Sequence, residues 1–359
     1  MTPAIRQYLV ITGNYWAFTL TDGALRMLVV LHFHQLGYSP LEIALLFIFY
    51  EFFGVVTNLV GGYLGARMGL NRIMNIGLFL QIVALAMLAV PAAMLTVPWV
   101  MAAQALSGIA KDLNKMSAKS GIKLLVPDQQ QGTLYKWVAI LTGSKNTLKG
   151  VGFFLGGFLL MVAGFKGAVI AMATALGLVW IASLFLLGQD LGKSKAKPKF
   201  KDILSKSRAI NVLSAARMFL FGARDVWFVV GIPVYFQSVL SDGTPEGARA
   251  AFFLIGGFMA AWIIAYGAVQ AGAPRLLRAA TRPEAEIVGQ AIRWAGLLVP
   301  IPLVLAGLAL AAGAPAVWLT GSVVAGLMLF GFVFAINSAV HSYLILAFTS
   351  EARVTMDVG

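Results

Sequence analysis

Lysines recur at helical spacing in a stretch of the chain that is otherwise suited to the interior of a membrane. Lys111, Lys115 and Lys119 lie four residues apart, and Lys145 and Lys149 repeat this spacing on the next hydrophobic segment. Residues four apart share one face of a helix, so like charges there repel one another. An ionisable residue deep in a membrane-spanning helix costs at least about 2.5 kcal/mol and normally faces a bundle interior or a watery pathway. The spacing therefore predicts that something anionic faces these lysines.

Arginine and aspartate occur together at corresponding places in the first and seventh predicted hydrophobic spans. The first span carries Asp22 and Arg26, and the seventh carries Arg224 beside Asp225. Corresponding features in two halves point to the binding site of a transporter. Because a planar guanidinium suits bidentate contact with phosphate or arsenate oxygens, we expect the two arginines to clamp a substrate that the lysines attract. Structural pairing of each arginine with an acid is the alternative.

The charged residues placed deepest in the predicted spans have a positive excess, since seven are basic and four are acidic. This excess suits a substrate with a phosphate, which carries nearly two negative charges at pH 7, and a second anionic group. A drug or sugar carrier has little use for it. For some of the lysines the alternative role is to neutralise Asp112 and Glu51. The residues expected to bind substrate are Arg26, Arg224, Lys111, Lys115, Lys145, Lys149 and Arg217, and the deep acids are Asp22, Glu51, Asp112 and Asp225.

Three of these acids are candidates for coupling transport to protons. If protons drive transport, Asp22, Glu51 or Asp225 has to change protonation during the cycle, because each could release a cation when it is neutralised. Asp225 is the first choice. The histidines are weaker candidates, since His32 and His34 cannot share a helical face as a metal pair and His341 reads as a satisfied interior side chain.

Composition places these residues in a membrane. The chain has 359 residues, of which 60% are hydrophobic and 11% charged, against about 25% charged in soluble domains. Apolar segments of 20 to 30 residues predict a polytopic all-α membrane protein rather than an outer-membrane barrel. The absence of cysteine excludes disulfides and cysteine-ligated metal centres. We predict no cofactor and no metal site.

The hydropathy pattern predicts ten transmembrane helices in two halves, namely residues 1–187, a basic cytoplasmic linker at 188–208, and residues 209–359 with four helices. An amino terminus in the cytoplasm places sixteen Lys and Arg in cytoplasmic segments and two outside. By the positive-inside rule this fixes the orientation, and it removes nucleic acid as the reason for the high net charge. The predicted spans are 8–35, 40–66, 73–95, 98–119, 134–163, 167–187, 209–239, 249–271, 287–312 and 315–348.

The loop after the second predicted span reads GGYLGARMGLNR. It resembles the loop signature of the major facilitator superfamily, with matches at Gly62, Leu64, Arg67 and Gly69, while Ala66 stands at the position of the family's acid. Glycines let helix ends pack closely, and Arg67 can cap carbonyls at the end of a helix. We therefore expect Gly62, Arg67 and Gly69 to form a conformational loop.

Over nearly its whole length the chain resembles the ArsJ-type organoarsenical efflux permeases, a bacterial branch of that superfamily. The resemblance is carried by NYWAFTLTDGALRMLVVLHF, SGIAKDLNKMSAKS, LYKWVAILTGSKNTLKGVGFFLGG and ARMFLFGARDVWFVVGIPVY, among other stretches. It implies export of 1-arseno-3-phosphoglycerate across the cytoplasmic (inner) membrane, and dependence on the glyceraldehyde-3-phosphate dehydrogenase that makes this compound. The superfamily has twelve helices, so the resemblance also implies that the last two are absent from this chain.

The sequence predicts a secondary-active transporter and not an enzyme. No Walker motif is present, so ATP is not the direct driver. An organophosphate/phosphate antiporter or a multidrug exporter of the same superfamily is the alternative within transporters. A membrane-embedded enzyme acting on phosphorylated lipid is the alternative from another class, but it needs a nucleophile or metal cluster that the histidines and carboxylates do not provide.

Overall fold

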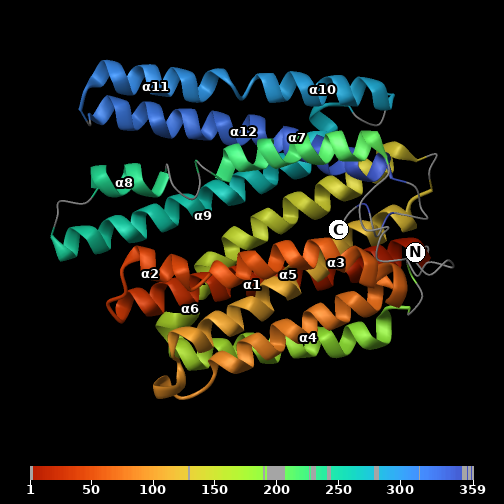
Figure 1. Cartoon of the computed structure of the whole chain (residues 1–359), viewed down its shortest axis with the longest axis horizontal. Helices are drawn as coiled ribbons and strands as arrows, with labels where there is room; N and C mark the ends of the chain where they lie inside the picture. Colours follow the sequence, from red (N-terminus) through yellow and green to blue (C-terminus); the bar gives the residue numbers. More distant parts are fainter. Residues whose placement is uncertain are drawn as a thin grey trace. The chain divides into compact units, whose positions relative to one another are not determined.

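The computed structural model describes residues 3–127, 130–188, 191, 207–225, 227, 232–240, 244–278, 283–314, 316–349, 354 and 357. Within these ranges the chain is helical, and none of them forms a β-strand (Figure 1). This confirms the all-α class predicted from the long apolar segments.

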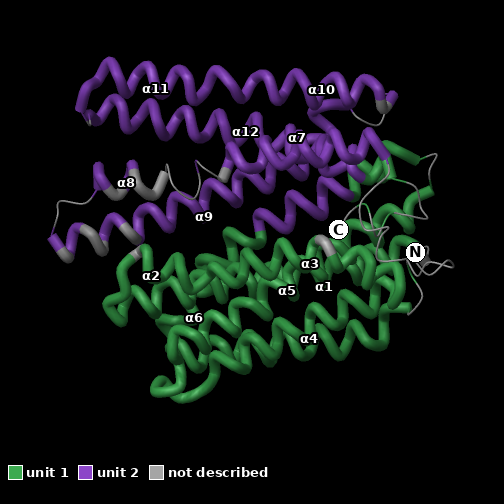
Figure 2. Tube along the Cα trace, in the orientation of Figure 1, with its two compact units in different colours: residues 1–137, 148–206, 346–359 green, residues 138–147, 207–345 purple. Residues whose placement is uncertain are grey.

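The chain divides into two compact units, coloured separately in Figure 2. Unit 1 comprises residues 1–137, 148–206 and 346–359, and unit 2 comprises residues 138–147 and 207–345. The predicted division at 187 and 209 stays a prediction, because most of the basic linker at 188–208 lies outside the described residues.

Unit 1 is a bundle in which α5 packs against α1, α3 and α4. A short 3₁₀ turn, Ala92–Met94, leads from α4 into α5, and Ser39 caps α2 through a capping box with Glu42. The helices are α1 (Pro3–Gln35), α2 (Pro40–Leu45), α3 (Ile48–Met68), α4 (Leu70–Leu88), α5 (Val97–Leu125) and most of α6 (Gln131–Leu186).

Two glycines with positive φ mark where helices of unit 1 change direction. Gly69, with φ 92°, ends α3 and precedes α4. Gly164, with φ 65°, interrupts α6 at the place where the hydropathy pattern predicts two spans, 134–163 and 167–187. Both angles lie in the region that glycine adopts readily and other residues avoid.

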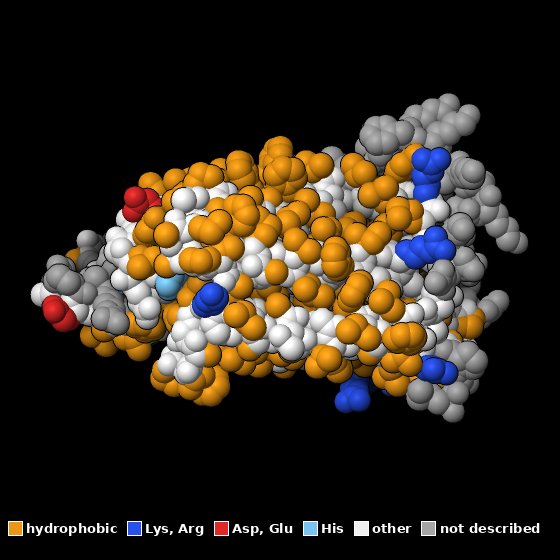
Figure 3. Space-filling model, turned by 90° about the horizontal axis from the view of Figure 1, so that it is seen from below, with side chains coloured by type: hydrophobic (Ala, Val, Ile, Leu, Met, Phe, Trp, Pro, Cys, Tyr) orange, Lys and Arg blue, Asp and Glu red, His pale blue; other side chains and the backbone are white. Residues whose placement is uncertain are grey.

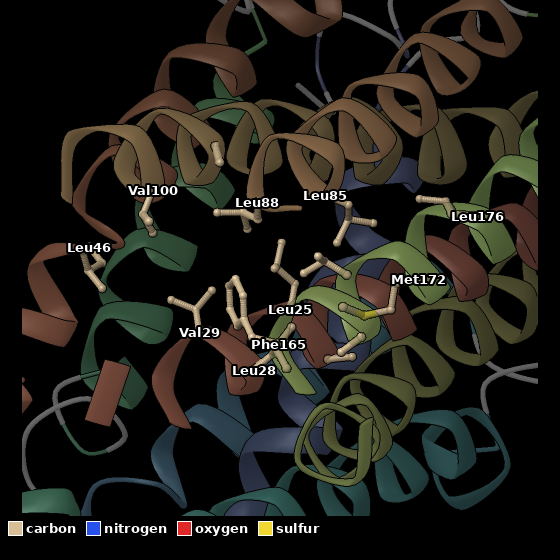
Figure 4. Packing of buried hydrophobic residues seen from close by; sticks show 14 of the residues in the cluster. Leu25, Leu28, Val29, Leu46, Leu85, Leu88, Val100, Phe165, Met172 and Leu176 are labelled. Carbon is tan, nitrogen blue, oxygen red and sulfur yellow. The ribbon is translucent and has the colours of Figure 1, made fainter. Parts of the chain in front are cut away.

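A large apolar cluster holds unit 1 together (Figure 4). Leu25, Leu28 and Val29 of α1 meet side chains of α4 and of the second part of α6, such as Leu85 and Met172. This cluster buries one face of α1. Asp22 lies three residues before Leu25 and seven before Val29, so it is buried on the same side of α1 as these two residues.

Unit 2 has a smaller core of aromatic and aliphatic residues centred on Trp262, Tyr266 and Phe334. The Trp262 indole N–H donates to the Leu327 carbonyl at 2.9 Å, which ties α9 to α12. Its helices are α7 (Arg208–Asp225), α8 (Ile232–Leu240), α9 (Pro245–Leu276), α10 (Glu284–Gly296), α11 (Pro300–Ala312) and α12 (Val317–Ala347).

Six segments of the described residues are long and apolar enough to cross a membrane. The count of ten spans stays a prediction. Large apolar side chains such as Phe185, Leu310 and Val317 are at least 84% exposed, as suits helices that contact lipid. The face drawn in Figure 3 is mainly hydrophobic, with most of its Lys and Arg side chains near one end.

Candidate functional site

Tyr50, near the start of α3, is the centre of a group of charged residues in unit 1. Its side chain is fully buried, and its hydroxyl donates a hydrogen bond of 2.7 Å to Oδ1 of Asp22. The Arg26 guanidinium carbon lies 4.0 Å from the centroid of the Tyr50 ring, and Nζ of Lys111 lies 4.2 Å from it. One aromatic ring thus serves two cations through cation–π contact.

Glu51 is shared by the same two cations. Nη2 of Arg26 lies 2.6 Å from Oε1 of Glu51, and Nζ of Lys111 lies 3.3 Å from Oε2. The Glu51 side chain is 62% exposed, whereas that of Arg26 is 23% exposed. This carboxylate is therefore the accessible member of the group.

Asp112 holds the deeper part of the group. Its side chain is 2% exposed, and Nζ of Lys115 lies 2.5 Å from Oδ1. Nζ of Lys111 lies 3.7 Å from Oδ2, so Lys111 bridges Asp112 and Glu51. We call the seven residues the unit 1 ion network, namely Asp22, Arg26, Tyr50, Glu51, Lys111, Asp112 and Lys115. Its three cations and three carboxylates balance.

Close backbone approach positions this network. Gly108 of α5 has no room for a Cβ, which would overlap the Tyr50 backbone carbonyl of α3. A Cβ on Gly23 of α1 would lie 2.6 Å from the carbonyl oxygen of Lys149 on α6. Small residues therefore bring α3 to α5 and α1 to α6 at the level of the charges.

For Arg26 and Asp22, the partners in this network lie on α3 rather than one turn away on α1. Arg26 pairs with Glu51, and Asp22 accepts from Tyr50, although Asp22 and Arg26 lie at i, i+4. Lys111 contacts both deep acids of α3 and α5, the arrangement that was the alternative for these lysines. Sequence reasoning missed Tyr50. Its only signal is that an aromatic residue precedes a deep acid.

A second polar cluster lies in unit 2 and involves α7, α9 and α12. The Arg224 guanidinium carbon lies 5.2 Å from the Phe221 ring and 5.5 Å from the Phe334 ring. Tyr266 of α9 is within hydrogen-bonding reach of Arg224 and Ser338. The cluster therefore combines cation–π contact with neutral hydrogen-bonding groups.

A chain of hydrogen bonds continues from this cluster to α6. Nδ2 of Asn146 donates to Oε1 of Gln270 at 2.6 Å, and Nε2 of Gln270 donates to the Ser338 hydroxyl at 3.0 Å. Gln270 and Ser338 are each at most 2% exposed. These bonds join α6, α9 and α12 within unit 2.

The other predicted site residues are placed as follows. Lys145 belongs to the part of α6 in unit 2, and Lys149 to the part in unit 1. Arg217 lies on α7, with its guanidinium carbon 5.1 Å from the Phe221 ring. The side chain of Asp225, the first choice for coupling, lies outside the described residues. Within the described ranges no group of three or more His, Asp and Glu could hold a metal ion.

Of the residues predicted to form a conformational loop, Gly62 and Arg67 lie within α3, because this helix continues to Met68, and Gly69 lies at the junction of α3 and α4. Nη1 of Arg67 donates to the Tyr63 hydroxyl at 2.7 Å, and the Gly69 N–H donates to the Gly65 carbonyl at 2.8 Å. The carbonyl of Leu191, beyond α6, accepts from the N–H of Leu70 at 2.8 Å. The junction thus also anchors the chain that leaves α6.

Comparison with solved structures identifies the fold. Three similar chains are a variant of the Escherichia coli fucose:proton symporter FucP, the human organic anion transporter MFSD10 (TETRAN), and the proton:xylose symporter XylE bound to 6-bromo-6-deoxy-D-glucose. Their TM-scores are 0.69, 0.68 and 0.70 at 12%, 15% and 14% sequence identity. The alignments cover 99%, 100% and 98% of this chain and 88%, 89% and 85% of the other chains.

Among curated proteins no sequence matches this chain. The family model described as Major Facilitator Superfamily matches residues 9–355. Proteins of this family are membrane transporters rather than enzymes. With nearly the whole chain matched, the protein is a multi-pass membrane protein that belongs to the Major Facilitator Superfamily.

Proposed function

We propose that this transporter is a secondary-active exporter of an organic polyanion, most specifically 1-arseno-3-phosphoglycerate, and that it gives arsenate resistance by alternating access. The resemblance to the ArsJ-type permeases supports the substrate. A glyceraldehyde-3-phosphate dehydrogenase that accepts arsenate would supply it. The bias of basic residues supports a bacterial cytoplasmic membrane protein with its amino terminus in the cytoplasm.

The distribution of charge is the observation that supports a polyanion as the substrate. Three of the four deep acids lie in the unit 1 ion network together with three cations, which they balance. The rest of the predicted deep set consists of Lys145, Lys149, Arg217 and Arg224 against Asp225, so its formal charge is positive, and Lys149 also interacts electrostatically with Glu51. A substrate with two anionic groups would compensate this positive charge.

Glu51 supports a linkage between the binding of an anionic substrate and the uptake of a proton. An anionic substrate group that binds Arg26 or Lys111 has to compete with the Glu51 carboxylate, which is accessible and holds both. Once displaced, Glu51 is free to take up a proton, so substrate binding and protonation would be linked. Asp22 is buried under the Tyr50 hydroxyl. We therefore rank Glu51 before Asp22 as the coupling acid, with Asp225 still a candidate.

Everted membrane vesicles test the substrate directly, because their outer face is the cytoplasmic one. Vesicles with the transporter, supplied with the dehydrogenase, glyceraldehyde 3-phosphate, oxidised cofactor and radiolabelled arsenate, should accumulate label. Omission of the dehydrogenase should abolish this accumulation. Vesicles that lack the transporter should not accumulate label. Equal accumulation with and without the transporter would refute the proposal.

Two alternatives from the same superfamily give different results in this assay. An organophosphate/phosphate antiporter would exchange labelled phosphoglycerate without arsenate, in proportion to phosphate inside the vesicles. A multidrug exporter would be inhibited by cationic dyes rather than by phosphoglycerate. One of the similar structures is that of the human organic anion transporter MFSD10, which agrees better with an anionic substrate than with a multidrug exporter.

A further inference from the structure

Three polar side chains in the interior of unit 2 have buried atoms without a hydrogen-bond partner among the described residues. These atoms are Nη1 of Arg217, both amide atoms of Asn337 and Nδ1 of His341. Asn337 is fully buried, and His341 is 6% exposed. Leaving a buried donor or acceptor unpaired costs about 1 to 3 kcal/mol. Such a cost at three nearby side chains calls for a physical reason.

Helices α7 and α12 bring the three side chains to one place. The Phe221 ring of α7 contacts the Phe334 ring of α12, with centroids 5.4 Å apart. Arg217 lies one turn before Phe221 and is close enough to His341 to interact with it electrostatically. Asn337 lies between Phe334 and His341 on the same side of α12, since residues three, four and seven apart share a helical face.

The surrounding polar groups are paired, so this is not a generally loose interior. Ser338, next to Asn337, accepts from Gln270 at 3.0 Å, and Gln270 accepts from Asn146 at 2.6 Å. Within the described part of unit 2, the unpaired buried side-chain atoms are therefore confined to Arg217 and to the side of α12 that carries Asn337 and His341.

The three groups together match an oxyanion that has a hydroxyl nearby. Arg217 supplies a positive charge and planar donors, Asn337 supplies a donor and an acceptor, and the imidazole of His341 supplies either. The oxygens of a carboxylate, phosphate or arsenate would satisfy the donors. A hydroxyl on a neighbouring carbon would satisfy the Asn337 carbonyl oxygen, which an oxyanion cannot do.

We propose that Arg217, Asn337 and His341 form a binding site for the oxyanion of a small anionic polyol whose hydroxyl donates to Asn337. The assignment rests on the proposed export of an organic polyanion. It adds Asn337 and His341 to the residues expected to bind substrate, and it names the chemical group of the substrate that unit 2 would bind.

Thermal unfolding of the purified full-length chain tests this assignment, followed by the fluorescence of its eight tryptophans. The probes are 3-phosphoglycerate, glycerol 3-phosphate, inorganic phosphate and neutral glycerol. The first two should raise the unfolding temperature, and glycerol should not. Asn337→Leu and His341→Leu should each weaken binding of 3-phosphoglycerate at least about tenfold, because each removes a hydrogen bond to a charged group.

The stability of the ligand-free protein separates a binding role from a structural one. Asn337→Leu, a near-isosteric change, should leave the ligand-free unfolding temperature unchanged or raise it, because it removes unpaired polar atoms. Gln270→Leu is the matched control on the neighbouring helix. It should lower that temperature, because it breaks both hydrogen bonds of Gln270.

The outcomes keep the two proposals apart. If both leucine variants bind 3-phosphoglycerate as the unaltered chain does, or if Asn337→Leu destabilises the ligand-free protein as much as Gln270→Leu, this site is wrong and export of the polyanion stands. If inorganic phosphate binds as tightly as glycerol 3-phosphate, the proposed contact between a substrate hydroxyl and Asn337 is wrong. Anion binding that these variants abolish, with no arsenate-dependent uptake by vesicles, would refute the export substrate and keep the site.

Discussion

The two units hold their interior cations by different chemistry. In unit 1, Arg26, Lys111 and Lys115 pair with carboxylates, and the Tyr50 ring lies against two of them. In unit 2, Arg217 lies against the Phe221 ring, and its Nη1 has no hydrogen-bond partner among the described residues. A carboxylate neutralises a neighbouring cation, whereas aromatic rings and hydroxyl groups stabilise the cation without neutralising it.

This difference suggests a division of labour. In a network whose charges balance, a cation becomes available to a ligand only when its carboxylate partner is protonated or displaced. Such a change could couple substrate binding to proton uptake. A cation supported by neutral groups keeps its full charge for a ligand. We therefore expect substitutions in unit 1 to act first on stability and coupling, and those in unit 2 to act first on anion binding.

The largest effect is expected for Asp112→Asn. Asp112 is the buried carboxylate of the unit 1 ion network, and its loss leaves Lys115 and Lys111 without their deep partner. Breaking one side of a buried ion pair typically costs about 3 to 5 kcal/mol. Thermal unfolding of the purified protein should show this loss. Glu51→Gln is the control, since its 62% exposed side chain predicts a much smaller change. Equal effects of the two variants would contradict a deep, self-contained network.

A smaller effect is expected for Gly108→Ala. The added methyl group would overlap the Tyr50 backbone carbonyl, so α3 and α5 would have to separate at the level of the charges. Overpacking of this kind costs about 1 to 3 kcal/mol. Gly13→Ala on α1 is the matched control, because nothing lies within 4 Å of its Cβ position. It should raise the free energy of unfolding by about 1 kcal/mol through helix propensity.

Tyr50→Phe should have a smaller effect again. The variant keeps the ring that faces Arg26 and Lys111 but removes the hydroxyl that donates to Asp22. A hydrogen bond to a charged group contributes about 1.5 kcal/mol or more, and the loss should appear as a lower unfolding temperature. Tyr50→Leu should cost more, because it also removes the cation–π contacts. Leucine and phenylalanine variants of equal stability would show that the ring does not support the cations.

Periodicity and hydropathy predicted what depends on one helix at a time. The all-α membrane class follows from the apolar segments. The shared face of Lys111 and Lys115 and the break near Gly164 in α6 follow from residue spacing and hydropathy. Each of these is set by local backbone geometry.

Partners on different helices could not be predicted, because they depend on how the helices are rotated and how closely they approach. Arg26 has Asp22 one turn away but pairs with Glu51 of α3. Tyr50 carries no charge, so nothing in an apolar segment marks it as the centre of an ion network. His341 reads as a satisfied interior histidine, but its Nδ1 lacks a partner among the described residues.

The smallest effect on stability is expected for Arg26→Lys and Arg224→Lys. Measurement of transport by these two variants compares the roles of units 1 and 2 most directly. Lysine in place of Arg26 can still pair with Glu51, so the free energy of unfolding should change by less than about 1 kcal/mol. Lysine in place of Arg224 keeps the charge but loses the planar group that lies on Phe221 and Phe334. If both arginines contact substrate through a bidentate fork, each variant should reduce arsenate-dependent uptake into everted vesicles about tenfold at normal expression.

Lys149→Arg is the control for these two variants. It keeps a charge that is assigned only to attraction of the substrate, so it should retain uptake. Full uptake by the double variant would assign both arginines to structure and leave the lysines of α5 and α6 and the Arg217 cluster to bind the anion. Loss in Arg224→Lys alone would instead support the division between a coupling unit and a binding unit, because only the arginine of unit 2 would then contact substrate.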